Sequence, residues 1–170
     1  MSGQKKAKLP LLDEIEIDFA RPDDAAEISR LLAVSFAPVK DVYTDEAFAH
    51  TTPPAEVISG RFGEGPIWVA RLNGQIVGTV SGVPETQRYY VRSMAVDPKY
   101  QGFGIGKKLL EALEADAESR GYKVIYLYTT YSLQSAVKLY KSCGYQWVRD
   151  TAEEEFYGTA GVEMEKKIGK

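Results

Sequence analysis

The segment from Met94 to Leu110 constrains the fold more than any other part of the chain, because a strand-like run passes into a helix through a glycine-spaced turn. The run stops at Pro98, and the helix opens after Gly102, Gly104 and Gly106. Glycine has no Cβ, so a bulky anion can approach its backbone amides closely. The first N–H groups of a helix have no partner and carry the positive end of the helix dipole. This turn therefore predicts a phosphate-binding site.

The charges of the predicted helix run against the usual order. Lys107 and Lys108 lie in its first turn, and its acidic residues follow toward the C-terminal end. Each misplaced charge costs roughly 0.3–1 kcal/mol at a surface helix end, which a polyanion bound at the N-terminus would offset. Alternatively, the two lysines pair with Glu111 and with other acids one turn away. That alternative leaves the glycine spacing unexplained.

Two common phosphate-binding patterns do not fit this turn. A P-loop needs a glycine five positions before its Gly-Lys pair and a hydroxyl after the lysine, where this chain has Gln101 and Lys108. A dinucleotide fingerprint read from Gly102 places Lys107 where the third glycine belongs. The pattern that remains is Gln-x-x-Gly-x-Gly, which begins at Gln101 and directly follows a strand.

This pattern resembles the acyl-coenzyme A signature of the GNAT family, the GCN5-related N-acetyltransferases. Residues 136–145, Ala-Val-Lys-Leu-Tyr-Lys-Ser-Cys-Gly-Tyr, resemble the penultimate helix of that family, with its Leu-Tyr pair and closing Gly-aromatic. The resemblance covers residues 88–148, about a third of the chain, whereas residues 1–65 match only in general layout. The two segments and the strand between them occur in the order that the family has.

The resemblance implies a single-domain α/β fold of the GNAT type. Its mixed, mostly antiparallel central sheet would have about seven strands, splayed after the fourth and flanked by about four helices. We expect residues 1–13 to be a loose N-terminal tail and residues 14–170 to be one N-acetyltransferase domain. Apolar periodicity and turn signals predict strands at 14–19, 67–72, 75–83, 89–96, 124–129, 145–149 and 161–168, and helices from 22, over 44–60 with a break at two prolines, over 105–120 and over 132–142.

Composition argues against several classes of protein. Hydrophobic residues make up 44% and charged residues 26%, and the apolar runs are only strand length, so neither disorder nor a membrane span is predicted. A net charge of −3 argues against a nucleic-acid surface. One cysteine and one histidine allow no internal disulfide and too few ligands for structural zinc. We expect a cytoplasmic protein.

The family resemblance implies acetyl-coenzyme A as cosubstrate and no metal. Its pyrophosphate would bind the backbone amides of the glycine turn, and its pantetheine arm would pair with the preceding strand as an added strand. Pro98 lacks an N–H and fits a sheet that opens at this point. The expected cofactor-binding residues are Met94, Ala95, Val96, Gln101, Gly102, Phe103, Gly104, Ile105, Gly106, Lys107 and Ser135.

Tyr140 matches the tyrosine that protonates the departing sulfur in many members of the family, so the resemblance implies that it is catalytic. A phenol of reference pKa about 10 can donate a strong hydrogen bond to a thiolate whose conjugate acid has a pKa near 8.5. The alternative is a core aromatic residue whose hydroxyl bonds to backbone. Spacing alone favours that alternative, and the resemblance reverses the preference.

The general base is not identified by the sequence. An alkyl amine has a pKa of about 10.4 and is mostly ammonium at neutral pH, so a base or a water relay is expected. Tyr90 stands where many relatives carry a glutamate, and Glu85 lies upstream in a predicted turn. Leu133 replaces a family asparagine, although Ser132 and Ser135 could supply hydroxyls. Cys143 is expected to be a structural thiol.

We expect transfer of an acetyl group to a primary amine, with a small molecule favoured over a protein lysine because nothing marks a peptide groove. Five tyrosines are predicted to surround the cleft and to shape an apolar or cation-accepting pocket, namely Tyr89, Tyr90, Tyr126, Tyr128 and Tyr131. No nucleic acid and no membrane is expected as a partner, and a homodimer stays open. The acidic segment 151–158 is expected to be a solvated loop. The alternatives are a non-catalytic acyl-coenzyme A sensor and a peptide amine acetyltransferase.

Overall fold

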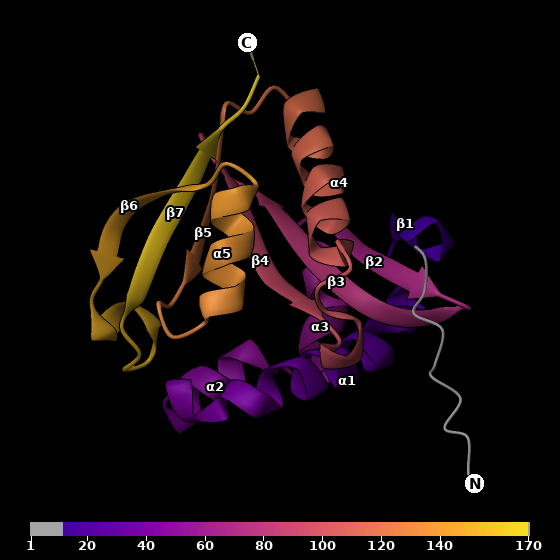
Figure 1. The fold of residues 1–170 in the computed structure, drawn as a ribbon, viewed down its shortest axis with the longest axis horizontal. Coiled ribbons are helices and arrows are strands. Elements are labelled where there is room, and N and C mark those ends of the chain that lie inside the picture. The colour runs from indigo at the N-terminus through magenta and orange to yellow at the C-terminus, as the bar shows by residue number, and fades with distance from the viewer. Residues whose placement is uncertain (1–11, 170) are drawn as a thin grey trace, which may run out of the picture.

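A seven-stranded sheet crosses the molecule in the order β1-β2-β3-β4-β5-β7-β6 in the computed structural model, which describes residues 12–169 (Figure 1). The pairing of β4 with β5 is parallel, and every other pairing in the sheet is antiparallel. The strands are β1 Glu16–Phe19, β2 Ile67–Leu72, β3 Gln75–Pro84, β4 Tyr89–Val96, β5 Val124–Thr129, β6 Gln146–Thr151 and β7 Gly161–Lys167.

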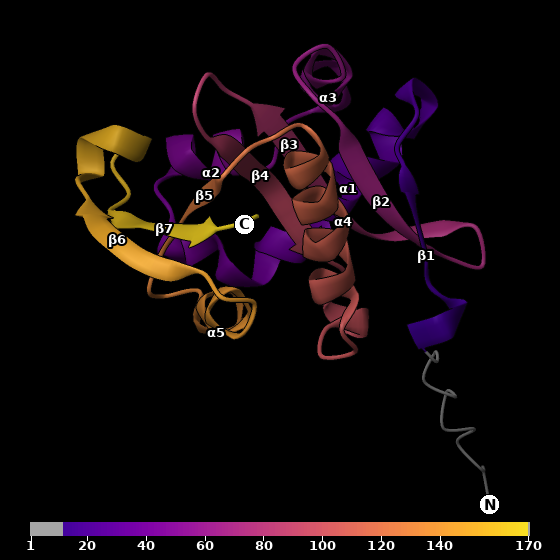
Figure 2. The same cartoon turned by 90° about the horizontal axis from the view of Figure 1, so that it is seen from above.

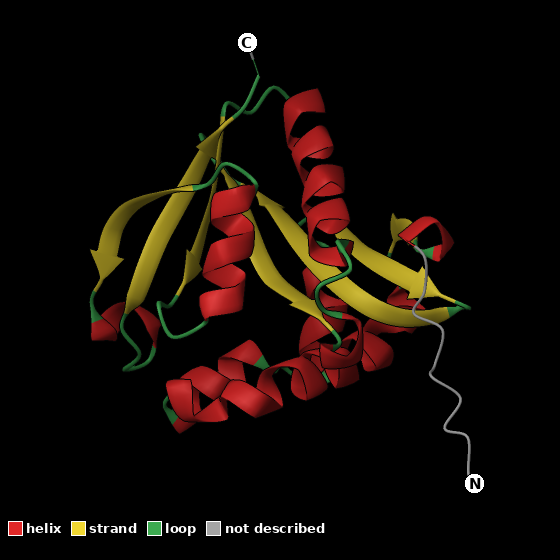
Figure 3. Ribbon diagram, viewed as in Figure 1, coloured by secondary structure: helices red, strands yellow, loops and turns green. Residues whose placement is uncertain are grey.

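Helices cover both faces of this sheet (Figures 2 and 3). On one face lie α4 and α5, and on the other lie α1 and α3, with α2 continuing from α1 toward the end that holds β6 and β7. Apolar side chains of α4 and α1, at helical spacing, fill the two cores between helices and sheet. The helices are α1 Ala25–Phe36, α2 Asp45–Thr51, α3 Ala55–Arg61, α4 Ile105–Ser119 and α5 Gln134–Ser142.

The sheet opens between β4 and β5. These strands pair only at Tyr89 with Ile125 and at Tyr90 with Tyr126, after which β4 runs on to Val96 without a partner on this side. Figure 1 shows the two strands diverging toward the lower part of the molecule. The backbone groups of the second half of β4 therefore border a gap, which is the splay that the sequence predicted after the fourth strand.

Local sequence signals explain most element boundaries. Asn73 and Gly74, with φ of 50° and 79°, close the β2–β3 hairpin in the left-handed angles that a tight turn of this kind requires. The two prolines at 53 and 54 separate α2 from α3, as predicted. The predicted GNAT-type sheet of seven strands is confirmed, and five α-helices, rather than about four, occur among residues 12–169.

The ends of the chain are described in part. Residues 1–11 of the expected tail lie outside the described residues, as does residue 170. Leu12–Glu14 form a short 3₁₀ helix that precedes β1. The division into a tail and one domain stays a prediction.

Candidate active site

The glycine turn lies between the end of β4 and the start of α4. Gly102 and Gly104 have φ of 85° and 84°, the left-handed region that glycine adopts without a steric penalty. Gly104 is the N-cap of α4, and no side chain caps this helix. The first N–H groups of α4 thus have no intrahelical acceptor, and Gln101, Gly102 and Gly104, which lead into the helix, are exposed. The backbone has the geometry of an anion site.

The lysines at the start of α4 do not pair with its acidic residues. Among residues 12–169, no ion pair joins Lys107 or Lys108 to an acid, and the Lys108 ammonium instead donates to the carbonyl oxygen of Leu12 at 3.1 Å. The alternative of local pairing with Glu111 is therefore not found. Positive charge at this helix end is left available for a ligand.

One side chain and one missing side chain fix the conformation and packing of the turn. The Gln101 amide donates to the carbonyl oxygen of Val96 at 3.0 Å and so braces the loop against the end of β4. A Cβ at Gly106 would lie 2.8 Å from Leu139 and 2.9 Å from Met94, so only glycine lets α4 approach α5 and β4 this closely. The third glycine thus serves packing, whereas the first two set the backbone conformation.

A bulge interrupts β4 beside the gap. Ser93 has a φ of 52°, and the pairing with β3 shifts so that Ser93 and Met94 together oppose a single residue. A left-handed angle is uncommon for a residue other than glycine and is typical of sites where strain serves a purpose. Arg61, at the end of α3, donates to the Ser93 hydroxyl at 2.9 Å and holds the bulge.

A cavity of about 700 Å³ fills the opening of the sheet. Its walls come from β4, β5, α5, the segment from α1 to α2 and the loop between β6 and β7. Backbone and side chains of Tyr90, Arg92 and Met94 form the β4 side. The volume suits a small organic molecule. The expected arm-binding strand thus lies against this cavity through Met94.

Tyr140 lies in this cavity. It is 8% exposed, on the side of α5 that faces the sheet, and its ring packs edge-on against Tyr145 at 5.9 Å between centroids. Its hydroxyl makes no hydrogen bond to any residue of the described chain, so the alternative in which backbone satisfies this hydroxyl is not found. Burial raises the pKa of Tyr140 above its ordinary value, which keeps the phenol protonated at neutral pH.

Three of the five predicted tyrosines form one wall. Tyr90 and Tyr126 stack at 5.1 Å, and Tyr128 packs edge-on against both, with Tyr90 and Tyr128 reaching the cavity. Tyr89 is an exception, because neighbours in a strand point to opposite faces. It is fully buried beneath α4 and donates to Asp116 at 2.7 Å. Tyr131 is exposed and bonds to Asp150.

The candidate bases lie in different places. Glu85 accepts a hydrogen bond from Tyr126 at 2.7 Å at the β3–β4 turn and does not line the cavity. Its role is to hold the tyrosine wall. The acidic segment, by contrast, contributes Glu154 and Glu155 to the cavity mouth, together with His50, whose ring stacks on Tyr157 at 3.7 Å. The sequence missed this contribution, since a charge run by itself resembles a solvated loop.

The remaining expected residues occupy the start and end of α5. Leu133 is the N-cap of the helix and lines the cavity, so an apolar side chain faces the site where relatives have an amide. Ser135 is exposed in the first turn of α5 and does not reach the cavity. Cys143 is a partly buried free thiol at the end of α5.

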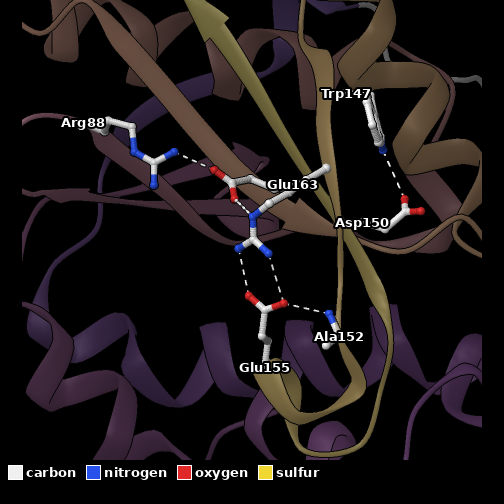
Figure 4. Close-up of polar contacts among 7 residues, drawn as sticks. Arg88, Trp147, Asp150, Ala152, Glu155 and Glu163 are labelled. Atoms are coloured by element: carbon white, nitrogen blue, oxygen red, sulfur yellow. Dashed lines mark hydrogen bonds and ion pairs between the residues drawn. The ribbon is translucent and has the colours of Figure 1, made fainter.

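An ion-pair network joins β6, β7 and the segment between them, which lines the cavity (Figure 4). Glu163 is 4% exposed and accepts hydrogen bonds from Arg88 and from Arg149, the latter at 2.8 Å. Arg149 also donates to both carboxylate oxygens of Glu155, at 3.0 and 2.8 Å. The bonds from Arg149, and next the bond from the Ala152 N–H, lower the pKa of Glu155. Glu155 is therefore held as an anion and is already paired.

We expect Glu163→Gln to lower the free energy of unfolding by about 1.5–3 kcal/mol, because it removes charge-assisted bonds from a buried acceptor. Glu165→Gln, two residues along the same strand and without an ion pair among residues 12–169, is the matched control and should change stability by less than about 0.5 kcal/mol. Urea denaturation measures both. Equal effects for the two variants would show that the network does not stabilise the fold.

Comparison with known proteins places this geometry in a family. The family model described as "Acetyltransferase (GNAT) family" matches residues 27–145, more than half of the chain. The chain belongs to the GNAT family. The resemblance inferred from the glycine turn and from the α5 segment is thereby confirmed for the family as a whole.

One curated relative of this GNAT chain is the N-acetylaspartate synthetase of Xenopus tropicalis, 40% identical over 83 residues, which are 48% of this chain and 31% of that protein. The chain spans about half or less of the length of the first curated relatives it matches. The similarity therefore concerns the GNAT domain of these proteins.

Solved structures show the same fold. PaiA N-acetyltransferase from Thermoplasma acidophilum, solved in complex with coenzyme A, has a TM-score of 0.75 at 19% identity and covers 91% of this chain and 99% of its own. The ribosomal-protein-S18-alanine N-acetyltransferase of Escherichia coli has a TM-score of 0.75 at 19% identity, with 92% and 95% covered.

Residues 12–169 contain neither a metal-binding cluster nor a membrane-spanning helix. No group of acidic, histidine or cysteine side chains there has the arrangement of a metal site. In the same part of the chain, every helix is too short or too polar to cross a bilayer.

Proposed function

We propose that this GNAT chain is an acetyl-coenzyme A-dependent N-acetyltransferase that transfers the acetyl group directly to the primary amine of a small molecule. One observation carries the proposal. Tyr140 and Met94 line the same cavity, in the gap between β4 and β5, and the Tyr140 hydroxyl has no protein partner among residues 12–169. Met94 belongs to the half of β4 that has no partner on the β5 side, and this strand leads to the glycine turn at the start of α4. An anion-binding turn, an unpaired strand edge and a free proton donor would thus serve successive parts of one cosubstrate.

The residues present fit acetyl-coenzyme A. The amides from Gln101 to Lys107 would hold its pyrophosphate, because the first turn of α4 is uncapped and carries excess positive charge. The backbone of Met94, Ala95 and Val96 would hold its arm, since this half of β4 has no partner strand on the β5 side. Ser135, which is exposed in the first turn of α5, would be an outlying contact of the same cosubstrate.

Tyr140 would donate its hydroxyl proton, or a strong hydrogen bond, to the sulfur that leaves. Because burial raises its pKa, the proton stays on the phenol before reaction, and full transfer is less favourable than a strong hydrogen bond. Tyr140 is 8% exposed, and a hydrogen bond in such a buried setting is stronger than in water. No covalent acyl-enzyme step is required, and Cys143 lies outside the cavity.

A small amine is favoured as acceptor by the cavity itself. Its volume suits a metabolite. The segment that joins β6 to β7 lines it and is tied to the start of α2, where the Thr44 hydroxyl donates to the Tyr157 carbonyl oxygen at 2.5 Å. We infer that this connection restricts access for a peptide on that side. The cytoplasmic location expected from the sequence stays part of the proposal.

We expect release of coenzyme A thiol from acetyl-coenzyme A only when a suitable amine is present. The experiment is a thiol-release assay with a panel of amino acids, polyamines, alkyl amines and lysine peptides, with mass spectrometry of the products. Acetylation of a small amine would support the proposal. Preference for peptides would favour a peptide amine acetyltransferase, and tight coenzyme binding with no turnover on any amine would favour the sensor.

A further inference from the structure

We propose that the acceptor carries a carboxylate beside its amine, as an amino acid does, and that Arg61 binds this carboxylate with Arg92 as its neighbour. This inference rests on the proposed function and names the acceptor class of the same cavity. Both arginines line the cavity, Arg61 from the end of α3 and Arg92 from β4.

Among residues 12–169, the two guanidinium groups have one acidic partner between them, and it pairs with Arg92 alone. Arg92 donates to Glu64 at 2.6 Å, and Glu64 is half exposed, at 51% of its side chain. Arg61 has no acidic partner in the described part of the chain, since its one hydrogen bond goes to the neutral hydroxyl of Ser93. The Nε of Arg92 is buried and has no acceptor among the same residues. The pair therefore carries an excess positive charge and unused donors.

This excess charge is unfavourable in the protein alone. Burial, and next the positive charge of Arg92, lower the pKa of Arg61, while Glu64 and Tyr90 act in the opposite direction. Arginine stays protonated in proteins, so the charge is not relieved by loss of a proton. An anion bound in the cavity against Arg61 would neutralise this excess charge. A planar carboxylate matches the two parallel N–H donors of a guanidinium.

The acidic and basic lining residues come from different elements. Glu154 and Glu155 belong to the segment between β6 and β7, whereas Arg61 ends α3 and Arg92 lies in β4. Glu155 is already paired with Arg149, so Glu154 is the one lining acid without a basic partner in the described part of the chain. An acceptor with an amine and a carboxylate matches this combination of an arginine pair and a free acid.

Proximity to the bulge limits the distance between the two acceptor groups. Arg61 holds Ser93, and the next residue is Met94, the first residue of the expected arm-binding backbone. A carboxylate on Arg61 would thus lie beside the predicted path of the thioester. An amine that attacks there is separated from its carboxylate by few bonds, which is the arrangement of an amino acid.

The test compares Arg61→Gln with the wild type on matched acceptors: the common amino acids, their carboxamides and the corresponding alkyl amines. We expect the wild type to prefer acids over amides, and Arg61→Gln to raise KM for acids at least tenfold while changing KM for amides less than twofold. Each comparison uses the same amine in two enzymes, so intrinsic amine reactivity cancels. Arg61→Lys should recover part of the preference, because it restores the charge without the planar fork.

Arg30→Gln is the matched control. Arg30 is exposed on α1, and its substitution removes the same charge at a place outside the cavity. It should leave the preference unchanged. Equal losses for acids and amides in Arg61→Gln would overturn the carboxylate site while leaving N-acetyl transfer intact. Should the wild type acetylate no amine, the proposed function fails instead, and calorimetric titration of the coenzyme A-bound protein with amino acids decides the site: binding that Arg61→Gln abolishes supports it, and no binding overturns it.

Discussion

Tyr140→Phe should lower kcat about 100-fold or more and leave KM for acetyl-coenzyme A within about threefold, because a positioned proton donor contributes roughly 10²–10⁴-fold to rate. The substitution removes one oxygen that has no protein partner among residues 12–169, so it creates no unsatisfied group and little change in packing. Steady-state kinetics with the acceptor found in the amine panel measures both constants. A loss in kcat without a loss in donor binding is the signature of a group that acts in the transition state.

Tyr145→Phe is the matched control for this experiment. Tyr145 packs against Tyr140 and is equally buried, but its hydroxyl donates to Glu114 at 3.1 Å, away from the cavity. We expect kcat within about twofold of wild type for this variant. Because burial raises the pKa of Tyr140, its ionisation should not limit the rate below pH 9, and the wild-type rate should rise with pH as the acceptor amine loses its proton. A wild-type rate in Tyr140→Phe at every pH would remove the residue from the mechanism.

Gly104→Asp should weaken coenzyme A binding roughly 10- to 100-fold, since a negative charge about 5 Å from a phosphate costs up to about 3 kcal/mol at an effective dielectric constant near 20. Asparagine and aspartate both tolerate the left-handed angle of this position. A Cβ there would lie 3.6 Å from the Leu12 side chain, an ordinary contact. Isothermal titration calorimetry with coenzyme A measures the affinity.

Gly104→Asn separates charge from shape in that experiment. It has nearly the same size and the same backbone strain as the aspartate variant and adds no charge, so the ratio of the two dissociation constants reports the electrostatic part. A negative charge at a helix N-terminus interacts favourably with the helix dipole, so the aspartate variant should be no less stable than the asparagine variant. If the two variants bind coenzyme A equally, the pyrophosphate lies elsewhere.

The fold was accessible from the sequence where local chemistry decides it. Asn73-Gly74, Pro98 and the glycine turn each restrict the backbone within a few residues, so the hairpin, the end of β4 and the start of α4 could be placed in advance. Sequence periodicity also separated the buried strand Val124–Thr129 from its neighbours.

The acceptor end of the cavity could not be predicted in the same way. Arg61 and Arg92 are 31 positions apart and line one cavity only because the end of α3 lies against β4, where Arg61 bonds to Ser93. Glu154 lines the cavity only because the segment between β6 and β7 lies there. The bulge at Ser93 depends on a register shift against β3, for which a serine gives no signal. The position of Tyr89 could have been predicted. Neighbouring residues of a strand point to opposite faces of the sheet, so Tyr89 and Tyr90 cannot both face the cleft.

The narrow parallel contact between β4 and β5 has a consequence for the protein as a mechanical object. Within residues 12–169, two residue pairs form the only ladder that couples the β1–β4 half of the sheet to the β5–β7 half. A donor arm bound along Met94 to Val96 would form backbone hydrogen bonds with the unpaired part of β4 and would stiffen the connection between the two halves. The cosubstrate would then act as a temporary eighth strand, and after its release the two residue pairs alone would connect the halves.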